Sequence, residues 1–162
     1  MKLFLMRHGE ADLLSCSDFS RPLTARGYSE SYKIANWLRI KNINIQQALV
    51  SPYLRAQQTL SVLCEVFPLI TTNQINTLHE LRPSGESSQV LSYLRLLNNK
   101  IAQSVIIISH LPFIHSLLTE IFLNESKIIL PPSSIAYIDL HFYFLLNKLQ
   151  WIISPKEIPD NA

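Results

Sequence analysis

Cysteine is scarce in this sequence, and the two that occur lack any metal-ligand spacing. Cys16 and Cys64 are the only cysteines among 162 residues. A chain of this length buries roughly 68–70% of its unfolded surface, so its core needs no disulfide support. Two free thiols in such a chain fit a reducing compartment better than a disulfide framework. We therefore expect a cytoplasmic protein without a bound metal.

Charge of either sign is also sparse. Charged residues make up 16% of the chain and the formal net charge is +2, whereas a typical charged share is about 25%. The sequence has no run of Lys and Arg and no stripe in which basic and aromatic residues alternate. These features argue against a nucleic-acid-binding protein.

Unbroken apolar runs of membrane-spanning length are missing as well. The most apolar long window, residues 105–123, contains His110, Pro112 and Glu120, so it does not qualify as a membrane span. The apolar start of the chain is interrupted by Arg7 and His8, unlike a secretory signal peptide. We expect no membrane partner.

Short apolar runs alternate with segments of helical periodicity. Four β-branched residues at 105–108 give the strongest strand signal, typical of burial on both faces. Residues 25–40 are expected to form a helix with Thr24 as its N-cap and an inner face of Tyr28, Tyr32, Ala35 and Leu38. Further strands are expected at residues 3–6 and 48–50, near 74–76, and at 135–146 and 149–153. Further helices are expected from Ser51-Pro52, with Ser51 as N-cap, over Val90 to Asn98-Asn99, and from Pro112.

This alternation predicts an α/β protein built as a three-layer α/β/α sandwich. The closing strand pair predicts an antiparallel edge on a mostly parallel central sheet. No internal repeat, low-complexity segment or linker divides the chain. We expect one domain over residues 1–153 and a loose tail at residues 154–162.

Polar side chains follow several of the expected strands. The first strand ends in Arg7-His8, the second is followed by Ser51 and Arg55, and the strand at 105–108 ends in Ser109-His110. Ligands of open α/β sheets bind outside the carboxyl ends of the strands. A multiply charged anion would suit this set of three arginines and two histidines, which includes Arg21 in the loop at residues 9–23. Phosphate matches the planar donor fork of arginine.

Four segments carry these residues in a characteristic order: Leu5-Met6-Arg7-His8-Gly9-Glu10, Arg21-Pro22-Leu23-Thr24, Ser51-Pro52-Tyr53-Leu54-Arg55-Ala56-Gln57-Gln58-Thr59 and Ile108-Ser109-His110. Together they resemble the histidine phosphatase superfamily, with its phosphoglycerate-mutase-like fold. The length and the Ser-His-Leu-Pro run look most like the short bacterial phosphohistidine phosphatases of the SixA type. The resemblance covers residues 2–140.

The resemblance implies a role for each matching residue. His8 would be the nucleophile that accepts the phosphoryl group, and Arg7, Arg55 and His110 would bind its oxygens, with no metal or other cofactor. A neutral imidazole is a competent nucleophile near pH 7, provided that an acceptor holds its other ring nitrogen, and we expect a backbone carbonyl near Gly9 in that role.

Three further residues are weaker candidates. Arg21 would contact the phosphate or, alternatively, only pair with Asp18 at the surface. Glu80 falls where many relatives carry a general acid, and the alternative is a solvated carboxylate. Leu111 is expected to offer its backbone N–H at the start of the helix, because Pro112 has none.

The short chain lacks room for the lid insertions of larger superfamily members. The resulting shallow site suits phosphohistidine on a histidine-containing phosphotransfer domain or a phosphocarrier protein. A small phosphomonoester substrate and a catalytically silent phosphoryl-binding module are the alternatives.

Overall fold

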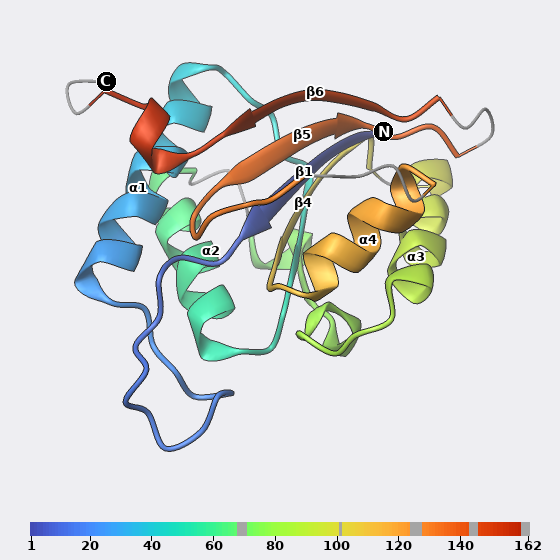
Figure 1. Ribbon diagram of the computed structural model, residues 1–162. Helices are drawn as coiled ribbons and strands as arrows, with labels where there is room; N and C mark the ends of the chain where they lie inside the picture. The colour runs from blue at the N-terminus through green and yellow to red at the C-terminus, as the bar shows by residue number, and fades with distance from the viewer. Residues whose placement is uncertain (68–70, 101, 124–127, 143–145, 160–162) are drawn as a thin grey trace.

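The computed structural model describes residues 1–67, 71–100, 102–123, 128–142 and 146–159 and shows helices on both faces of one mixed sheet (Figure 1). The six strands lie in the order β3-β2-β4-β1-β5-β6. Pairing is parallel from β3 to β1 and antiparallel from β1 to β6. The strands are β1 (Lys2–Arg7), β2 (Gln47–Val50), β3 (Ile75–Thr77), β4 (Ser104–Ser109), β5 (Ile135–Asp139) and β6 (Lys148–Ile153), and the helices are α1 (Ala25–Ile40), α2 (Leu54–Val66), α3 (Ser87–Lys100) and α4 (Phe113–Ile121).

The two faces of the sheet bury separate clusters of apolar side chains. Along β4, Val105 and Ile107 face the cluster that includes α3 and α4, while Ile106 and Ile108 face the cluster that includes α1 and α2. This alternation is the period of two of an extended strand. The predicted three-layer α/β/α sandwich with a mostly parallel sheet and an antiparallel edge is thereby confirmed.

Helix α1 has its predicted bounds but a different inner face. Thr24 caps it by accepting a hydrogen bond from the backbone N–H of Gly27. The predicted burial of Tyr28 and Tyr32 is wrong, since these side chains are 44% and 47% exposed. The inner face instead begins with Gly27 and Ser31, because the helix packs against the loop after β1: a Cβ on Gly27 would lie 2.1 Å from the carbonyl oxygen of Glu10.

Helix α2 starts later than the Ser51-Pro52 sequence predicts. Its first residue is Leu54 and its N-cap is Tyr53, so Ser51 as N-cap is wrong. The Ser51 side chain lies 2.7 Å from Nε2 of His110, and the chain makes a bend before the helix. Similarly, α4 begins at Phe113, and Pro112 is its N-cap rather than its first residue.

The C-terminal part departs most from the predictions. Strand β5 ends at Asp139, not at 146, since Leu140 turns into the core with 3% exposure; residues 143–145 lie outside the described part. The predicted loose tail is wrong for residues 154–158. Pro155–Glu157 form a 3-10 helix, and Ile158 is buried in the α1–α2 cluster.

No helix in the described ranges is long and apolar enough to cross a membrane.

Candidate active site

Three strand ends meet at one edge of the sheet. The His8 N–H donates to the carbonyl of Ser109 over 3.0 Å, and the Ser51 N–H donates to the carbonyl of Ile108 over 3.1 Å. The parallel pairing of β2, β4 and β1 therefore brings His8 and His110 together, with ring centroids 4.8 Å apart. The predicted convergence at the carboxyl ends of the strands is what the fold produces.

The His8 ring is held in one orientation at both nitrogens. Its Nδ1 lies 2.6 Å from the carbonyl oxygen of Gly9, and its Nε2 accepts from Nε of Arg55 over 3.2 Å. These partners assign the proton to Nδ1 and a lone pair to Nε2. The backbone acceptor expected near Gly9 is therefore present.

Burial lowers the pKa of His8 to about 4, helped by the charges of Arg55, Arg7 and Arg21 and opposed by the hydrogen bond to Gly9. A pKa near 4 leaves the ring neutral at pH 7, which is the form that can attack an electrophile.

The loop at Gly9 fits between two helices. The Gly9 N–H donates to Oγ1 of Thr59 on α2 over 3.0 Å. On the other side, a Cβ on Gly9 would lie 2.6 Å from the carbonyl oxygen of Gly27 on α1. Only glycine fits this approach without movement, and the carbonyl that holds His8 is thereby positioned by both helices.

Arg55 reaches the site from the first turn of α2. Its guanidinium donates through Nη1 to the carbonyl of Asp18 over 2.5 Å and through Nη2 to Oδ2 of Asp18 over 3.2 Å. It also stacks over the Tyr53 ring, with Cζ 4.8 Å from the centroid. The side chain is nearly fully buried, so its charge acts on His8 with little screening by solvent.

His110 pairs with Ser51. The Tyr53 N–H donates to the Ser51 hydroxyl oxygen over 3.4 Å, so the hydroxyl hydrogen is available for Nε2 of His110 over 2.7 Å. When the hydroxyl donates to Nε2, the ring proton of His110 lies on Nδ1. Burial lowers the pKa of His110 to about 2, together with the charge that a protonated His8 would carry and the charges of Arg55 and Arg7. The His110 ring is neutral at pH 7.

Several buried polar atoms at the site have no partner. Within the described ranges, the buried side-chain atoms without a hydrogen bond are Nε of Arg7, Nδ1 of His110 and Oγ of Ser134. Arg7 is otherwise anchored by Nη1, which donates to the carbonyl of Leu130 over 3.0 Å. Unpaired buried donors are costly, and an anion would satisfy two donors of this set.

Arg21 lies at the exposed side of the site. Its Nη1 pairs with Oδ1 of Asp18 over 3.0 Å, and its Nε donates to the carbonyl of Asp12 over 2.5 Å. Asp18 therefore bridges Arg21 and Arg55. Burial alone would raise the pKa of the Asp18 carboxyl, but hydrogen bonds and charges from both arginines hold it below its usual range. The ion pair expected as one alternative is present; phosphate contact stays a prediction.

The two remaining candidates are Glu80 and Leu111. Glu80 belongs to the 3-10 helix His79–Leu81 and lines a cavity of about 260 Å³ with Gln89 and Tyr93. Among the contacts of the described residues, none joins its carboxylate to His8 or His110. Leu111 lies in the turn between β4 and α4 with 37% exposure, and its role as a donor stays a prediction.

Sequence reasoning missed the roles of Thr59 and Ser51 as supports of the site. Thr59 lies four residues after Arg55, hence on the same face of α2, a spacing that could have been noticed. Ser134 was also missed, and no sequence signal connects it with β1. Its carbonyl accepts the Arg7 N–H over 3.0 Å.

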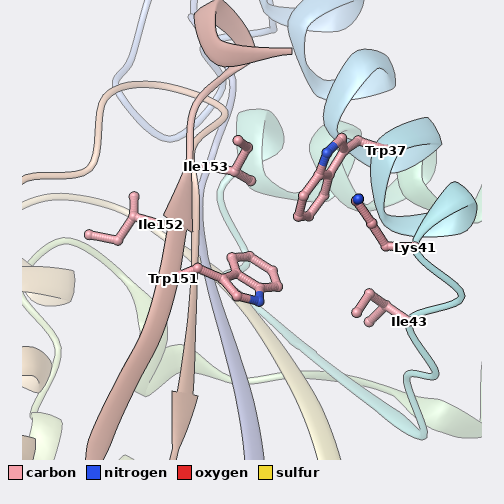
Figure 2. A pocket seen from close by; sticks show the side chains of 6 residues that line it. All are labelled: Trp37, Lys41, Ile43, Trp151, Ile152 and Ile153. Atoms are coloured by element: carbon pink, nitrogen blue, oxygen red, sulfur yellow. The ribbon is translucent and has the colours of Figure 1, made fainter. Parts of the chain in front are cut away.

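A second cavity has a mainly apolar lining, unlike the candidate active site. A cavity of about 460 Å³ between α1 and β6 is lined by Trp37, Lys41, Ile43, Trp151, Ile152 and Ile153. Figure 2 shows the two indole rings next to each other in this lining, and their centroids are 5.1 Å apart. Lys41 is the only ionisable side chain in this lining, which has no nucleophile.

Within the described ranges, no group of three or more His, Cys, Asp or Glu could hold a metal ion.

Comparison with known proteins agrees with the family resemblance of the sequence. The family model of the histidine phosphatase superfamily (branch 1) matches residues 3–84. Phosphohistidine phosphatase SixA of Escherichia coli (strain K12) is 41% identical over 140 residues, 86% of each chain. A SixA homolog of Haemophilus influenzae is 33% identical over 141 residues, 84% of this chain and 86% of the relative.

The fold agrees over nearly the whole chain. A solved structure of the protein histidine phosphatase SixA complexed with tungstate is 38% identical, with a TM-score of 0.90 over 98% of this chain and 100% of the other. A SixA-like structure from Agrobacterium tumefaciens, 22% identical, shares the fold with a TM-score of 0.80 over 95% of this chain and 97% of the other. On the sequence and the fold together, the chain belongs to the histidine phosphatase superfamily.

Proposed function

We propose that this protein acts in the cytoplasm and removes the phosphoryl group from a phosphohistidine on another protein, through a transient phosphohistidine at His8. The observation that carries the proposal is the neutral His8 ring, whose Nε2 lone pair is directed at the cationic group of Arg55. The names of the two curated relatives support the choice of substrate.

Binding would use the donors that lack partners. Arg7 through Nε and His110 through Nδ1 supply two buried N–H groups, and Arg55 supplies a fixed positive charge. Phosphoryl transfer depends mainly on positioning and on stabilising the charge of the equatorial oxygens. Cations and N–H donors that are already rigidly held meet both needs. As phosphate binds, its negative charge would raise the pKa of both histidines toward their ordinary values.

The reaction would take two displacements. First, the Nε2 lone pair of His8 forms a bond to phosphorus while the P–N bond of the substrate breaks, and the electron pair returns to the substrate imidazole, which takes a proton from solvent. Then a water oxygen attacks the phosphorus of phospho-His8, the bond to Nε2 breaks, and the proton of the water leaves to solvent. The products are inorganic phosphate and the unmodified histidine.

A general acid is less important for this substrate than for an ester. The leaving imidazole nitrogen gains a proton readily, whereas an alkoxide leaving group needs an acid. Glu80 lies beside α3, and its role as a general acid stays a prediction. The proposed partner is a histidine-containing phosphotransfer domain or a phosphocarrier protein.

The test is a panel of substrates with two histidine variants. The intact protein should release phosphate from phosphorylated phosphotransfer proteins, and His8→Ala should not. The matched control is His115→Ala, which removes an exposed histidine on α4. A reactive phosphodonor should leave acid-labile phosphate on the intact protein and none on His8→Ala.

Two outcomes would contradict the proposal. If His8→Ala retains full activity, His8 is not the nucleophile. If small phosphomonoesters are hydrolysed faster than phosphohistidine and Glu80→Gln abolishes that activity, the protein is a monoesterase.

A further inference from the structure

The Arg55 guanidinium faces two neighbours with different atoms. Its Nε donates to Nε2 of His8 over 3.2 Å, whereas both Nη atoms donate to Asp18. Asp18 offers them two acceptors, its backbone carbonyl at 2.5 Å from Nη1 and its Oδ2 at 3.2 Å from Nη2. Among the described residues, Asp18 is also the one carboxylate that forms an ion pair with Arg55. The orientation of the group that faces His8 therefore depends on Asp18.

A guanidinium that is held at two of its nitrogen atoms has a fixed direction at the third. The group is planar, and its N–H bonds diverge at fixed angles. The Tyr53 ring also lies against it, with Cζ of Arg55 4.8 Å from the ring centroid. With Asp18 on both Nη atoms, the Nε–H of Arg55 cannot turn away from His8 without breaking two further hydrogen bonds.

Asp18 itself is fastened by contacts that do not involve Arg55. Arg21 donates through Nη1 to the other carboxylate oxygen of Asp18, Oδ1, over 3.0 Å. The next residue, Phe19, accepts a hydrogen bond at its carbonyl from the Leu54 N–H over 3.0 Å, which ties this part of the loop to the start of α2. The Asp18 carboxylate is therefore a fixed support rather than a side chain that follows Arg55.

A carboxylate at this place also has an opposing effect on phosphate. Burial would raise the pKa of Asp18, but hydrogen bonds and charges from Arg55 and Arg21 hold it below its usual range, so the group is ionised at pH 7. Its negative charge reduces the attraction of both arginines for a phosphoryl group. If repulsion were its main effect, removal of the charge would strengthen substrate binding and leave the chemical step unchanged. If orientation of Arg55 is its main effect, the chemical step must slow.

We propose that Asp18 is a positioning residue, which holds both Nη atoms of Arg55 so that the Nε–H stays directed at the place where phosphorus meets Nε2 of His8. As the lone pair of Nε2 forms its bond to phosphorus, the Nε–H exchanges this nitrogen for a phosphoryl oxygen. A donor that is already held in place stabilises the developing charge without reorganising during the reaction. The inference rests on the proposed function.

The test measures kcat and KM of Asp18→Asn with a phosphorylated phosphotransfer domain as substrate. Asn keeps the size and the backbone carbonyl of Asp18 but offers one side-chain acceptor where the two arginines need two. We expect kcat to fall about tenfold, because a reacting group is then oriented less well. KM should not rise, since the lost negative charge no longer opposes the phosphoryl group.

Two further variants show whether the effect passes through Arg55. Asp12→Asn is the matched control: it removes a carboxylate charge from the same loop, and the Oδ1 of Asp12 accepts only the Leu14 N–H over 2.9 Å. It should keep the kcat of the unchanged protein. In a protein that already carries Arg55→Lys, Asp18→Asn should change kcat less than about twofold, because the fork that Asp18 orients is gone.

The outcomes separate this inference from the proposed function. If the unchanged protein releases phosphate and Asp18→Asn keeps its kcat with a lower KM, Asp18 only repels the substrate, and the positioning role is refuted while the proposed function stands. An equal loss in Asp12→Asn, or a full tenfold loss in the Arg55→Lys protein, also refutes the positioning role. If the unchanged protein releases no phosphate from phosphohistidine, the proposed function fails, and the positioning role with it.

Discussion

The hydroxyl of Thr59 connects α2 with the loop that holds the proposed nucleophile. It accepts a hydrogen bond from the Gly9 N–H over 3.0 Å and donates to the carbonyl of Arg55 over 2.7 Å. Thr59 is fully buried. Thr59→Val keeps the shape of the side chain and removes both hydrogen bonds, so the Gly9 N–H would be buried without an acceptor.

The expected loss of stability follows from that single N–H group. A buried donor left unsatisfied costs roughly 1–3 kcal/mol. In a protein of this size, 1 kcal/mol corresponds to a change of roughly 2–4 °C in Tm. We therefore expect Thr59→Val to lower Tm by about 4–8 °C for a loss of about 2 kcal/mol. The measurement is thermal unfolding followed by circular dichroism.

The effect on activity comes from the neighbouring carbonyl. The carbonyl of Gly9 holds Nδ1 of His8, and the Gly9 N–H anchors the same residue. With that anchor lost, the ring is oriented less well, and small displacements at a reacting centre are costly. We expect kcat to fall about tenfold or more, and Thr59→Ser to restore it.

A control separates this effect from the loss of a helical side-chain hydrogen bond. Thr119 on α4 also donates to the carbonyl four residues earlier, that of His115, over 2.8 Å, but it receives no N–H from a loop. Thr119→Val should change stability by less than about 0.5 kcal/mol. This explanation is refuted if Thr59→Val has the same Tm and the same kcat as the unchanged protein. It is also refuted if Thr59→Val and Thr119→Val lose the same amount of stability.

Three further predictions concern the other groups of the site. Ser51→Ala should lower kcat about tenfold, because His110 loses the partner that sets its tautomer; unchanged kcat in a phosphatase assay would contradict this. Arg55→Lys should lower kcat/KM roughly 10²-fold, since a point charge cannot replace the guanidinium fork, whereas Arg39→Lys on the surface should not. Because the pKa of His8 is about 4, kcat/KM corrected for spontaneous hydrolysis should stay level from pH 8 to about 5 and fall near 4; a fall centred at 6.5 would contradict the neutral, buried ring. Over the same range the free energy of unfolding should decrease as pH falls from about 6.5, because the unfolded chain binds a proton that the folded His8 does not.

Local chemistry made several parts of the fold predictable. The β-branched run at 105–108 is the centre of β4, and Thr24 caps α1 as its side chain suggests. Each of these outcomes depends on neighbours within a few residues. The predictions that failed depend on distant contacts. The Tyr28 face of α1 is exposed because Gly27 has to approach Glu10, and Ser51 does not cap α2 because His110, 59 residues later, engages its hydroxyl.

The sequence by itself determined which chemical groups are available and the strand ends at which they stand. Arg7, His8, Arg55 and His110 follow from the motif segments, and the period of two in β4 follows from residue type. Only the tertiary structure decided how these groups are paired: Nε2 of His8 with Arg55, 47 residues away, and Nη1 of Arg7 with the carbonyl of Leu130, 123 residues away. The physical reason is that residue type sets local geometry and acidity in water, whereas tautomer, pKa and buried hydrogen bonds depend on which strands lie side by side and which loops then cover their ends.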